Sequence, residues 1–556
     1  MPMGAAAYPA ASFFSVRKGR KMKQLILPAL RMELEEGEAA FRRSAARQLS
    51  IREEDIRGLR IFRQSLDARK KNDLFFSVHC LLTLEDRAAA RLLKNPKLHA
   101  QPVRQEEETP LTHGGRPRRG RIVVAGFGPA GIFAAWLLAK EGYAPLVVER
   151  GKEIPRRTAD VERYWCSGIP DPESNPLFGE GGAGTFSDGK LTSRSKDSRG
   201  DKVLHLLRQA GAPEEIEYLA KPHVGTDRLR EVVQNLRREI LEMGGEVRFE
   251  TCLTAIHMGV EGIAQVCLRY RDREETIPCD ALVLAIGQGA RDTYTYLYEQ
   301  GVAMAPKPFA IGVRAEHPQS LINVSQYGSF AGHPRLGAAE YRLTAQSGGR
   351  GVYTFCMCPG GYVVGASAKP GEMVVNGMSH FARDGKNANS AVVVQVGPED
   401  FGTDALAGMR FQQRLEEAAW TLGGGQGLAP ACRLGDFLRG QKTKAFREVE
   451  PTFRPGVVGA DLGKCLPEFA SAALREGLSA FGRQIKGYDG EDAVLTAIES
   501  RTSAPLRILR NEKGQSLTHP GVYPVGEGAG YAGGIVSAAI DGLRAAEEII
   551  TLWQQA

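Results

Sequence analysis

The residues Arg121-Ile-Val-Val-Ala-Gly-Phe-Gly-Pro-Ala-Gly131 place an apolar run directly before the pattern Gly-x-Gly-x-x-Gly. A helical run from Ile132 to Glu141 follows, and Ala144-Pro-Leu-Val-Val-Glu149-Arg150 then has the composition of a second strand ending in an acid. Strand, glycine loop, helix, strand and acid in this order are typical of the unit that binds an adenine dinucleotide. The sequence therefore predicts a Rossmann-type domain from residue 120.

Each residue type in this unit has a physical role. Gly126 permits the tight turn after the strand, and Gly128 lets a pyrophosphate approach the backbone. Gly131 allows the helix to pack closely against the sheet, and the unpaired N–H groups at the helix N-terminus attract phosphate. Glu149 lies about 20 residues further on, where an acid accepts hydrogen bonds from ribose hydroxyls.

Three further segments favour FAD over NAD. Gly179-Glu-Gly-Gly-Ala-Gly-Thr-Phe-Ser-Asp-Gly-Lys190 is a glycine-rich loop that lets backbone approach a large ligand, and Asp280-Ala-Leu-Val-Leu-Ala-Ile-Gly287 is a buried strand ending in glycine. Gly521 to Val536 forms a second strand and glycine loop, followed by a helix to about Ile550. The N-terminus of that helix can face the negative charge of a reduced flavin.

These motifs together resemble a family of bacterial FAD-dependent dehydrogenases in the glutathione-reductase-type flavoprotein superfamily, on the branch of p-hydroxybenzoate hydroxylase and geranylgeranyl reductase. The resemblance extends from about residue 22 to 550 and includes Lys307-Pro-Phe-Ala-Ile-Gly-Val-Arg314. It implies FAD as cofactor but names no substrate. The FAD-binding residues that it implies, together with those derived above, are Gly126, Gly128, Pro129, Ala130, Gly131, Glu149, Arg150, Gly182, Ser187, Asp188, Gly189, Lys190, Leu253, Gly287, Gly526, Glu527, Gly534 and Ile535.

The sequence also departs from two related patterns. Gly423-Gly-Gly-Gln-Gly427 follows a helical segment rather than a strand, so a separate NADPH domain is not expected. NAD(P)H could still dock transiently at the flavin as an electron donor. The chain has no Cys-x-x-Cys run, which argues against an iron–sulfur cluster.

The expected fold class is α/β, with a Rossmann-type FAD-binding domain, an inserted α+β substrate (cap) domain and a small N-terminal α+β domain. Residues 1–21 read as a flexible extension, 22–100 as the N-terminal domain and 101–119 as a linker. The FAD-binding domain would comprise 120–294 and 506–556, and the cap 295–505. Expected elements outside the dinucleotide unit are strands at 23–27, 58–63, 74–83, 246–256, 309–315, 352–358, 362–366 and 391–396, and helices at 38–49, 406–422, 466–481 and 492–499.

Two thiols lie two residues apart in the apolar run Gly351-Val-Tyr-Thr-Phe-Cys356-Met-Cys358. On a regular strand, both would share one face with Thr354, opposite Phe355 and Met357. We interpret them mainly as wall material of a substrate pocket. The alternatives are a redox dithiol, although no basic residue is adjacent in sequence, and plain core packing. A metal site lacks further ligands at fitting spacing. No metal is expected.

Other candidates for chemistry lie in polar loops. His380 could be a proton donor near neutral pH, and the alternative is a surface histidine. Arg501 and Arg507 could bind an anionic substrate or the carbonyl edge of a flavin. The alternative for these arginines is an ion pair with Glu499 or a neighbouring carboxylate. The candidate catalytic residues are thus Cys356, Cys358, His380 and Arg501.

Composition and charge restrict the partners. No apolar run approaches the roughly 18 residues that a membrane-spanning helix needs, and nine scattered cysteines do not form a secreted disulfide framework, so a cytoplasmic location is expected. Residues 1–120 carry 24 Lys and Arg but 14 Asp and Glu, although the whole chain has a net charge of +7. Residues 22–119 could therefore contact an anionic partner such as RNA; a solvated basic surface is the simpler interpretation.

The function expected from these observations is that of an FAD-dependent oxidoreductase, a dehydrogenase or reductase acting on a small molecule. Hydride or electrons would pass at the flavin N5 position. The alternative is a flavin-bearing binding protein associated with RNA through its basic N-terminal domain.

Overall fold

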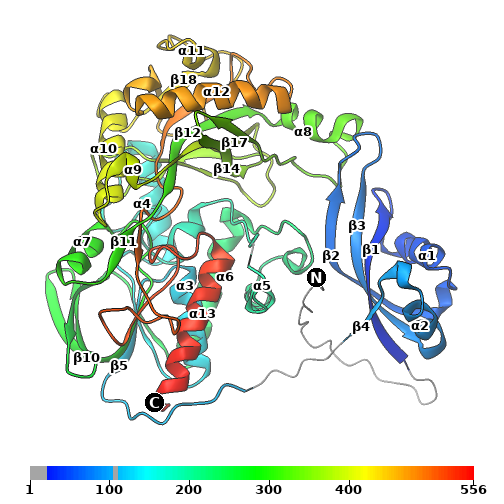
Figure 1. Cartoon of the computed structure of the whole chain (residues 1–556), viewed down its shortest axis with the longest axis horizontal. Helices are drawn as coiled ribbons and strands as arrows, with labels where there is room; N and C mark the ends of the chain where they lie inside the picture. Colours follow the sequence, from blue (N-terminus) through cyan, green and yellow to red (C-terminus); the bar gives the residue numbers. More distant parts are fainter. Residues whose placement is uncertain (1–21, 104–109, 194, 556) are drawn as a thin grey trace.

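The structure is a computed structural model that describes residues 22–103, 110–193 and 195–555. It is a mixed α/β fold with several sheets, arranged as a small unit beside a larger two-part body (Figure 1). The expectation of a flexible extension at residues 1–21 and part of the expected linker lie outside the described residues.

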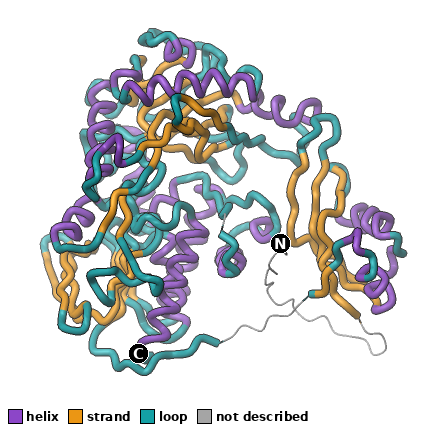
Figure 2. The backbone as a smooth tube through the Cα atoms, viewed as in Figure 1, coloured by secondary structure: helices purple, strands orange, loops and turns teal. Residues whose placement is uncertain are grey.

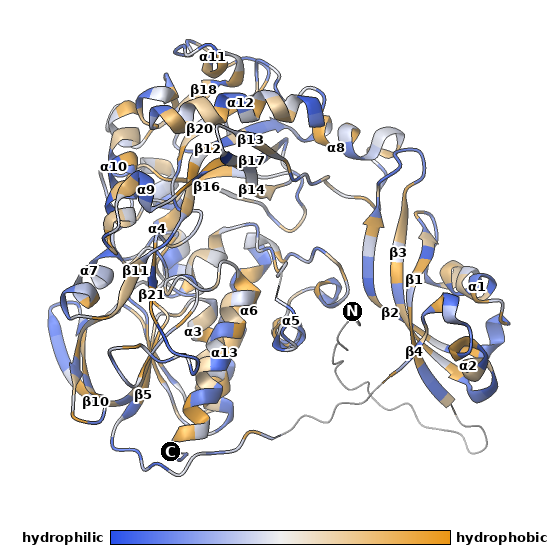
Figure 3. Ribbon diagram, in the orientation of Figure 1, coloured by the Kyte–Doolittle hydropathy of each residue, from blue (hydrophilic) through white to orange (hydrophobic). Residues whose placement is uncertain are grey.

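The N-terminal unit is a four-stranded antiparallel sheet with two helices on one face (Figure 2). Both hydrophobic and hydrophilic residues occur along its strands (Figure 3), and the hydrophobic ones face the helices. The strand order is β2-β3-β1-β4. The elements in chain order are β1 Met22–Glu33, α1 Glu38–Leu49, β2 Ile56–Asp67, β3 Phe75–Glu85, α2 Asp86–Leu93 and β4 Gln101–Pro102.

The predicted elements of this unit are confirmed, but the strands are longer than expected. The first strand continues past Leu27 because Leu30 and Met32 resume the buried alternation after a bulge, where Ala29 has a φ of 58°. The second strand extends to Asp67. On its free edge, the backbone of Gln64 exchanges hydrogen bonds with Tyr218 and Ala220 of the body.

The lower part of the body is built on a parallel sheet in the order β7-β6-β5-β10, with β22 pairing in parallel beside β10. Its strands are β5 Arg121–Ala125, β6 Leu146–Val148, β7 Glu246–Arg248, β10 Arg273–Leu284 and β22 Val522–Pro524. The strands β8 Thr251–Met258 and β9 Ile263–Tyr270 extend β10 as an antiparallel layer. This sheet confirms the predicted strands at 121–125, 144–150 and 280–287.

Three helices cover one face of this sheet: α3 Pro129–Lys140, α6 Gly225–Glu242 and α13 Ile535–Leu552. Nearly every residue of α3 is buried because it lies between the sheet and α13 (Figure 1). The helices α4 Ile154–Ser167, α5 Arg199–Gln209 and α7 Arg291–Glu299 complete this part of the body.

The upper part, here called the cap, is a seven-stranded sheet in the order β13-β14-β17-β12-β20-β18-β19. Its strands are β12 Phe309–Pro318, β13 Thr344–Ser347, β14 Arg350–Cys358, β17 Asn387–Val396, β18 Ala429–Arg433, β19 Val457–Gly459 and β20 Val494–Glu499. Helix α12 Glu468–Gln484 lies along this sheet, with α10 Ala407–Leu422 at its side (Figure 1). Smaller elements are α8 Gln319–Tyr327, α9 Pro398–Phe401, α11 Leu434–Leu438, β15 Tyr362–Gly365 and β16 Val375–Met378.

One predicted element of the cap is wrong. Residues 492–499 were expected to be helical, but Val494–Glu499 is strand β20, hydrogen-bonded between β12 and β18. All six of its residues are buried, so the segment lacks the exposed polar face of an amphipathic helix. Pairing on both edges therefore decides the conformation here over local preference.

A two-stranded antiparallel ribbon joins the cap to the lower part. β11 Met304–Pro306 leads into the cap, and β21 Leu506–Ile508 pairs with it where the chain returns. No helix of the described residues is both long enough and apolar enough to span a membrane.

The contact between α3 and α13 gives a test of this packing. A methyl group at Gly542 would lie 2.0 Å from the carbonyl oxygen of Ala130. We expect Gly542→Ala to lower the free energy of unfolding by about 1–3 kcal/mol, because the two helices cannot separate without opening the core. Urea unfolding followed by circular dichroism measures this. Gly115→Ala, exposed with no atom near the added methyl, is the control and should change stability little.

Candidate functional site

A cavity of about 420 Å³ lies between the parallel sheet and the cap. Its walls come from the carboxyl ends of β5, β6, β10 and β22, the loop at 182–190, and cap residues near Cys356 and Arg501. Ligands of open parallel sheets bind at this edge of the strands. The predicted site residues that line the cavity are Gly126, Gly128, Pro129, Ala130, Glu149, Arg150, Gly182, Ser187, Asp188, Gly189, Lys190, Leu253, Gly287, Cys356, Arg501, Gly526, Glu527, Gly534 and Ile535.

Three predicted site residues do not line this cavity: Gly131, Cys358 and His380. Gly131 serves packing instead, because a methyl group there would lie 1.9 Å from the carbonyl oxygen of Gly126. His380 is exposed, with its ring 5.9 Å from that of Tyr362, so the structure does not bring it to the cavity as a proton donor. Cys358 lies buried behind the wall.

The turn at Gly126 brings the first glycine loop close to the end of β10. Gly126 has a φ of 104°, and a side chain there would lie 2.2 Å from the carbonyl oxygen of Ala285. Only glycine satisfies both the left-handed backbone and this close approach. The turn directs α3 so that its first residues, Pro129 and Ala130, form the cavity floor.

Two helices begin at the cavity with glycine as the N-cap residue. Gly128 precedes α3 and Gly534 precedes α13, and both line the cavity. Glycine has no side chain to accept hydrogen bonds from the first N–H groups of a helix, so these donors are directed to the cavity. The helix dipoles add partial positive charge at the same two places. This edge of the cavity is therefore suited to anionic groups.

Glu149 organises the loops around it. Its carboxylate accepts hydrogen bonds from the backbone N–H groups of Phe127 at 2.8 Å, Gly151 at 2.9 Å and Gly179 at 2.8 Å. The predicted role was to accept from ribose hydroxyls, and the residue does line the cavity. Three of about four lone-pair positions are already used by the backbone, so Glu149 also fixes the first glycine loop against the second.

Sequence reasoning missed Arg157, which holds the loop at 179–190. This arginine is fully buried, and its guanidinium donates to the carbonyl oxygens of Asn175 at 3.1 Å, Glu180 at 2.6 Å and Gly182 at 3.0 Å. Burial lowers its pKa to about 9. A buried cation bonded to three carbonyls gives this glycine-rich loop a fixed shape.

At the end of the cavity near β6, Arg150 and Leu253 form the wall. Arg150 is paired with Glu173 at 2.8 Å and Asp292 at 2.9 Å, and its guanidinium lies 4.3 Å from the ring centre of Phe178. The arrangement presents a flat cation and an apolar side chain, which fits a planar heteroaromatic ring.

At the opposite end, Glu527 is half-buried in the cavity wall. Gln288 donates from Nε2 to Glu527 Oε1 at 3.0 Å, and to the carbonyl oxygen of Arg501 at 3.0 Å. Burial raises the pKa of Glu527 to about 7, against the opposing effect of Lys307. Gln288 was not predicted, although its position directly after the strand-ending Gly287 is a usable signal.

Arg501 is held by two carboxylates rather than directed freely into the cavity. It bonds to Glu416 at 2.7 Å and to Glu372 at 3.0 Å, and Arg291 bonds to the same two glutamates. The expected alternative partner, Glu499, instead pairs with Arg314 at 3.0 Å. Two arginines and two glutamates balance in charge, so this cluster fixes the floor of the cap. Arg507, the other arginine proposed from sequence to bind an anion, lies outside this cluster, with its guanidinium 4.9 Å from the ring centre of Tyr531.

The strand carrying the two thiols is not regular. Cys356 has a φ of 46°, and the pairing of β14 with β17 shifts register between Phe355 and Cys358. The predicted alternation is therefore wrong: Phe355 and Cys356 both line the cavity, whereas Met357 and Cys358 are buried. The bulge turns one thiol toward the cavity and leaves the other behind it.

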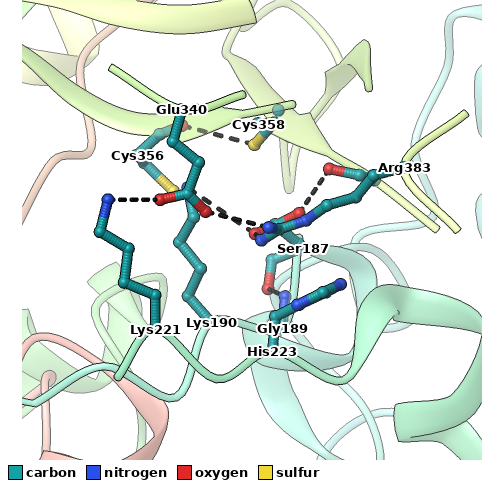
Figure 4. Close-up of polar contacts among 12 residues, drawn as sticks. Ser187, Gly189, Lys190, Lys221, His223, Glu340, Cys356, Cys358 and Arg383 are labelled. Atoms are coloured by element: carbon teal, nitrogen blue, oxygen red, sulfur yellow. Dashed lines mark hydrogen bonds and ion pairs between the residues drawn. The ribbon is translucent and has the colours of Figure 1, made fainter. Parts of the chain in front are cut away.

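No basic residue is adjacent to the thiols in sequence, but the fold brings two cations close to them. Arg314 Nη1 lies 3.1 Å from the carbonyl oxygen of Cys356 and 3.9 Å from Cys358 Sγ. Lys190 extends toward Cys356 from the glycine-rich loop (Figure 4). The hydrogen bond with the Cys358 thiol, the largest effect, and the two cations lower the pKa of Cys356, while burial opposes them. The described residues contain no group of three His, Cys, Asp or Glu placed to hold a metal ion.

The raised pKa of Glu527 gives a pH test. Its pKa is raised above the ordinary value of 4.5, so the folded state keeps a proton that the unfolded state loses. Stability should therefore fall as pH rises from about 4.5 to about 7 and change no further above that through this group. Glu527→Gln removes the titration, so its stability relative to the parent should increase across this interval. Urea unfolding at several pH values measures the difference; a pH-independent difference would contradict the assignment.

Comparison with known proteins gives partial matches along the chain. A family model described as "FAD-dependent protein, C-terminal domain-like" matches residues 308–502, and a domain of unknown function matches residues 22–82. A flavin-dependent brominase, solved as a triple mutant, is 12% identical over 77% of this chain and 79% of that chain, with a TM-score of 0.34. A geranylgeranyl bacteriochlorophyll reductase-like protein from Thermoplasma acidophilum is 12% identical over 77% of each chain, also with a TM-score of 0.34.

A much closer relative comes from Clostridium beijerinckii (strain ATCC 51743 / NCIMB 8052), where it is described as an uncharacterized protein. It is 48% identical over 526 residues, which cover 94% of this chain and 97% of that protein. Because nearly the whole of both chains aligns at this identity, the chain belongs to the same protein family as the Clostridium beijerinckii protein.

Proposed function

We propose that this protein is an FAD-dependent oxidoreductase, a dehydrogenase or reductase whose substrate is a small molecule. The observation that carries the proposal is a single cavity bounded by two glycine loops that each begin a helix, at Gly128 and at Gly534. One nucleotide needs one such loop. A ligand that meets both must be extended, with an anionic centre and a second polar chain, as FAD is.

The residues present fit FAD along the length of the cavity. Arg150 and Leu253 would hold adenine, and Glu149 has capacity left for one ribose hydroxyl. The N–H groups at the start of α3 would hold the pyrophosphate. Gly526 and Glu527 would meet the ribityl chain, and Gly534 with Ile535 the flavin ring. The family description of the cap as part of an FAD-dependent protein supports the same cofactor.

Space at one glycine provides a direct test of fit. A methyl group built on Gly533 meets no atom within 4 Å, although Gly533 lines the cavity. A side chain there would therefore occupy space that a bound ligand needs, without clashing with the protein itself.

When bound, FAD would accept a hydride or electrons from the substrate and pass them to an acceptor. The chain's own residues orient the ring, exclude water and hold protons near it. The carboxyl group of Glu527 is the candidate proton carrier, because a group with a pKa of about 7 exists in both protonation states at neutral pH. Lys190 and the ring of Phe355 form other parts of the same cavity.

One observation argues against a separate nicotinamide domain in this chain. Gly423 to Gly427 lies at the C-terminal end of α10, where the helix dipole repels phosphate. A dinucleotide site on that glycine run is therefore disfavoured. NAD(P)H, if it is the electron donor, would dock transiently at the flavin face.

The experiment is to purify the parent protein and Gly533→Val and to record their visible spectra. We expect the parent to carry FAD, identified by releasing the nucleotide and separating it by chromatography. Gly533→Val should retain less than about a tenth of that FAD, since a loss of about 1.4 kcal/mol of binding free energy weakens the affinity for FAD tenfold. Gly115→Val, in open space outside the cavity, is the matched control and should keep it. A folded parent protein that takes up no FAD would contradict the proposal.

A further inference from the structure

We propose that Cys356 and Cys358 form a redox-active dithiol that exchanges electrons with an organic disulfide in the cavity. Cys356 is the attacking thiol and Cys358 the resolving thiol. The inference rests on the proposed function in one respect, because the bound FAD would supply or accept the electron pair that returns the thiols to their starting state.

The two thiols have the unequal exposure that such a pair needs. Cys356 lines the cavity at the bulge of β14, so a disulfide entering the cavity can reach its sulfur. Cys358 is fully buried. Its Sγ lies 3.4 Å from the carbonyl oxygen of Cys356, so the second sulfur is held beside the backbone of the first cysteine. A second thiol held at this place can attack a disulfide formed on Cys356 and is protected from external reagents itself.

The surroundings favour a thiolate at Cys356. Four cations and three carboxylates form the ion pairs beside the thiols, so an anionic sulfur is favoured by one excess positive charge. Figure 4 shows Lys190, Lys221, Arg383 and Glu340 of this set around Cys356 and Cys358. These cations are Lys190, Lys221, Arg314 and Arg383, and the carboxylates are Asp188, Glu340 and Glu499. Among these four cations, Lys190 lines the cavity and lies 3.7 Å from Asp188, so its charge is shared between that carboxylate and the sulfur.

Two further titratable groups face this network. Glu527 adds a negative charge near Cys356 only as pH rises through about 7, and it then opposes the thiolate. His223 is half-buried and stacks on Phe381, and loss of solvent lowers its pKa, so it stays neutral at pH 7. Thiolate character at Cys356 is therefore expected at neutral pH, which is the condition for nucleophilic attack.

The chemistry balances in two steps. The Cys356 thiolate attacks one sulfur of a disulfide RSSR; the S–S bond breaks, a mixed disulfide forms and RS⁻ leaves as a thiol after taking a proton. The Cys358 thiol then loses its proton and attacks the Cys356 sulfur, which releases the second RSH and leaves a Cys356–Cys358 disulfide. Two electrons pass from the protein to the external disulfide, and FAD in its reduced form would restore the dithiol.

Three other cysteines lack this combination of access to the cavity and basic surroundings. Cys432 and Cys465 are both buried in the cap core, and burial raises the pKa of each. Cys166 is exposed at the end of α4 and does not line the cavity. It is the appropriate internal standard for thiol reagents, because it has access to solvent and lies outside the cavity.

The test uses the purified full-length protein in buffers with a series of ratios of oxidised to reduced glutathione at pH 7. Samples are quenched with acid and alkylated, and the peptides are identified by mass spectrometry. We expect an internal Cys356–Cys358 disulfide that forms in one two-electron transition. Cys358→Ser should accumulate glutathione on Cys356, and Cys356→Ser should leave Cys358 unmodified. Lys190→Met should slow alkylation of Cys356 at pH 7 by about tenfold, whereas Lys221→Met, which removes an exposed ammonium paired with Glu340, should slow it much less.

Absence of the internal disulfide at ratios that modify Cys166 would overturn the proposal, as would equal modification of Cys356 and Cys358. The visible spectrum of the same samples separates this result from failure of the proposed function. Protein that carries FAD but forms no disulfide contradicts only the dithiol. Protein that forms the disulfide but binds no FAD contradicts the proposed function and leaves the thiol chemistry in place.

Discussion

The first N–H groups of two helices, α3 and α13, have no side-chain acceptor at their glycine N-caps, and both are directed to one cavity. The remaining architecture follows from placing these two ends side by side. The parallel order of β5, β10 and β22 brings their carboxyl ends to the same edge of the sheet, and the helices that follow β5 and β22 start there. Close packing of α3 against α13, through Gly542, keeps the two ends in register.

The cap closes this edge with buried charges that are paired among themselves. Arg501 and Arg291 share Glu416 and Glu372, and Arg314 pairs with Glu499. Buried ion pairs contribute little net stability but are costly to break, so they fix geometry more than they add energy. Beside these balanced pairs, the network around Lys190 has one more cation than carboxylate. The excess lies where Cys356 reaches the cavity, and this connects the electrostatics of the cap to the proposed chemistry.

Much of the cofactor end could be predicted from sequence because its signals are local. Gly126 and Gly131 follow from the geometry of one turn and one helix, and Glu149 follows at a fixed distance along the chain. The surroundings of the thiols could not be predicted, because Lys190, Arg314 and Cys356 are far apart in sequence. Only the packing of the cap on the loop at 182–190 brings them together. The bulge at Cys356 depends on pairing with β17, and β20 is a strand because of its two partners rather than its own composition. His380 carried the right chemistry in a loop that the fold leaves outside the cavity.

The central claim is that a single ligand spans both helix ends, and hydrogen–deuterium exchange tests it most directly. The exchange of backbone amides at residues 127–132 and 533–538 is compared in the FAD-free protein and after adding FAD, ADP or riboflavin. The account predicts that FAD slows exchange at both segments together, ADP only at the first and riboflavin only at the second. Protection of one segment alone by FAD, or of neither, would contradict it.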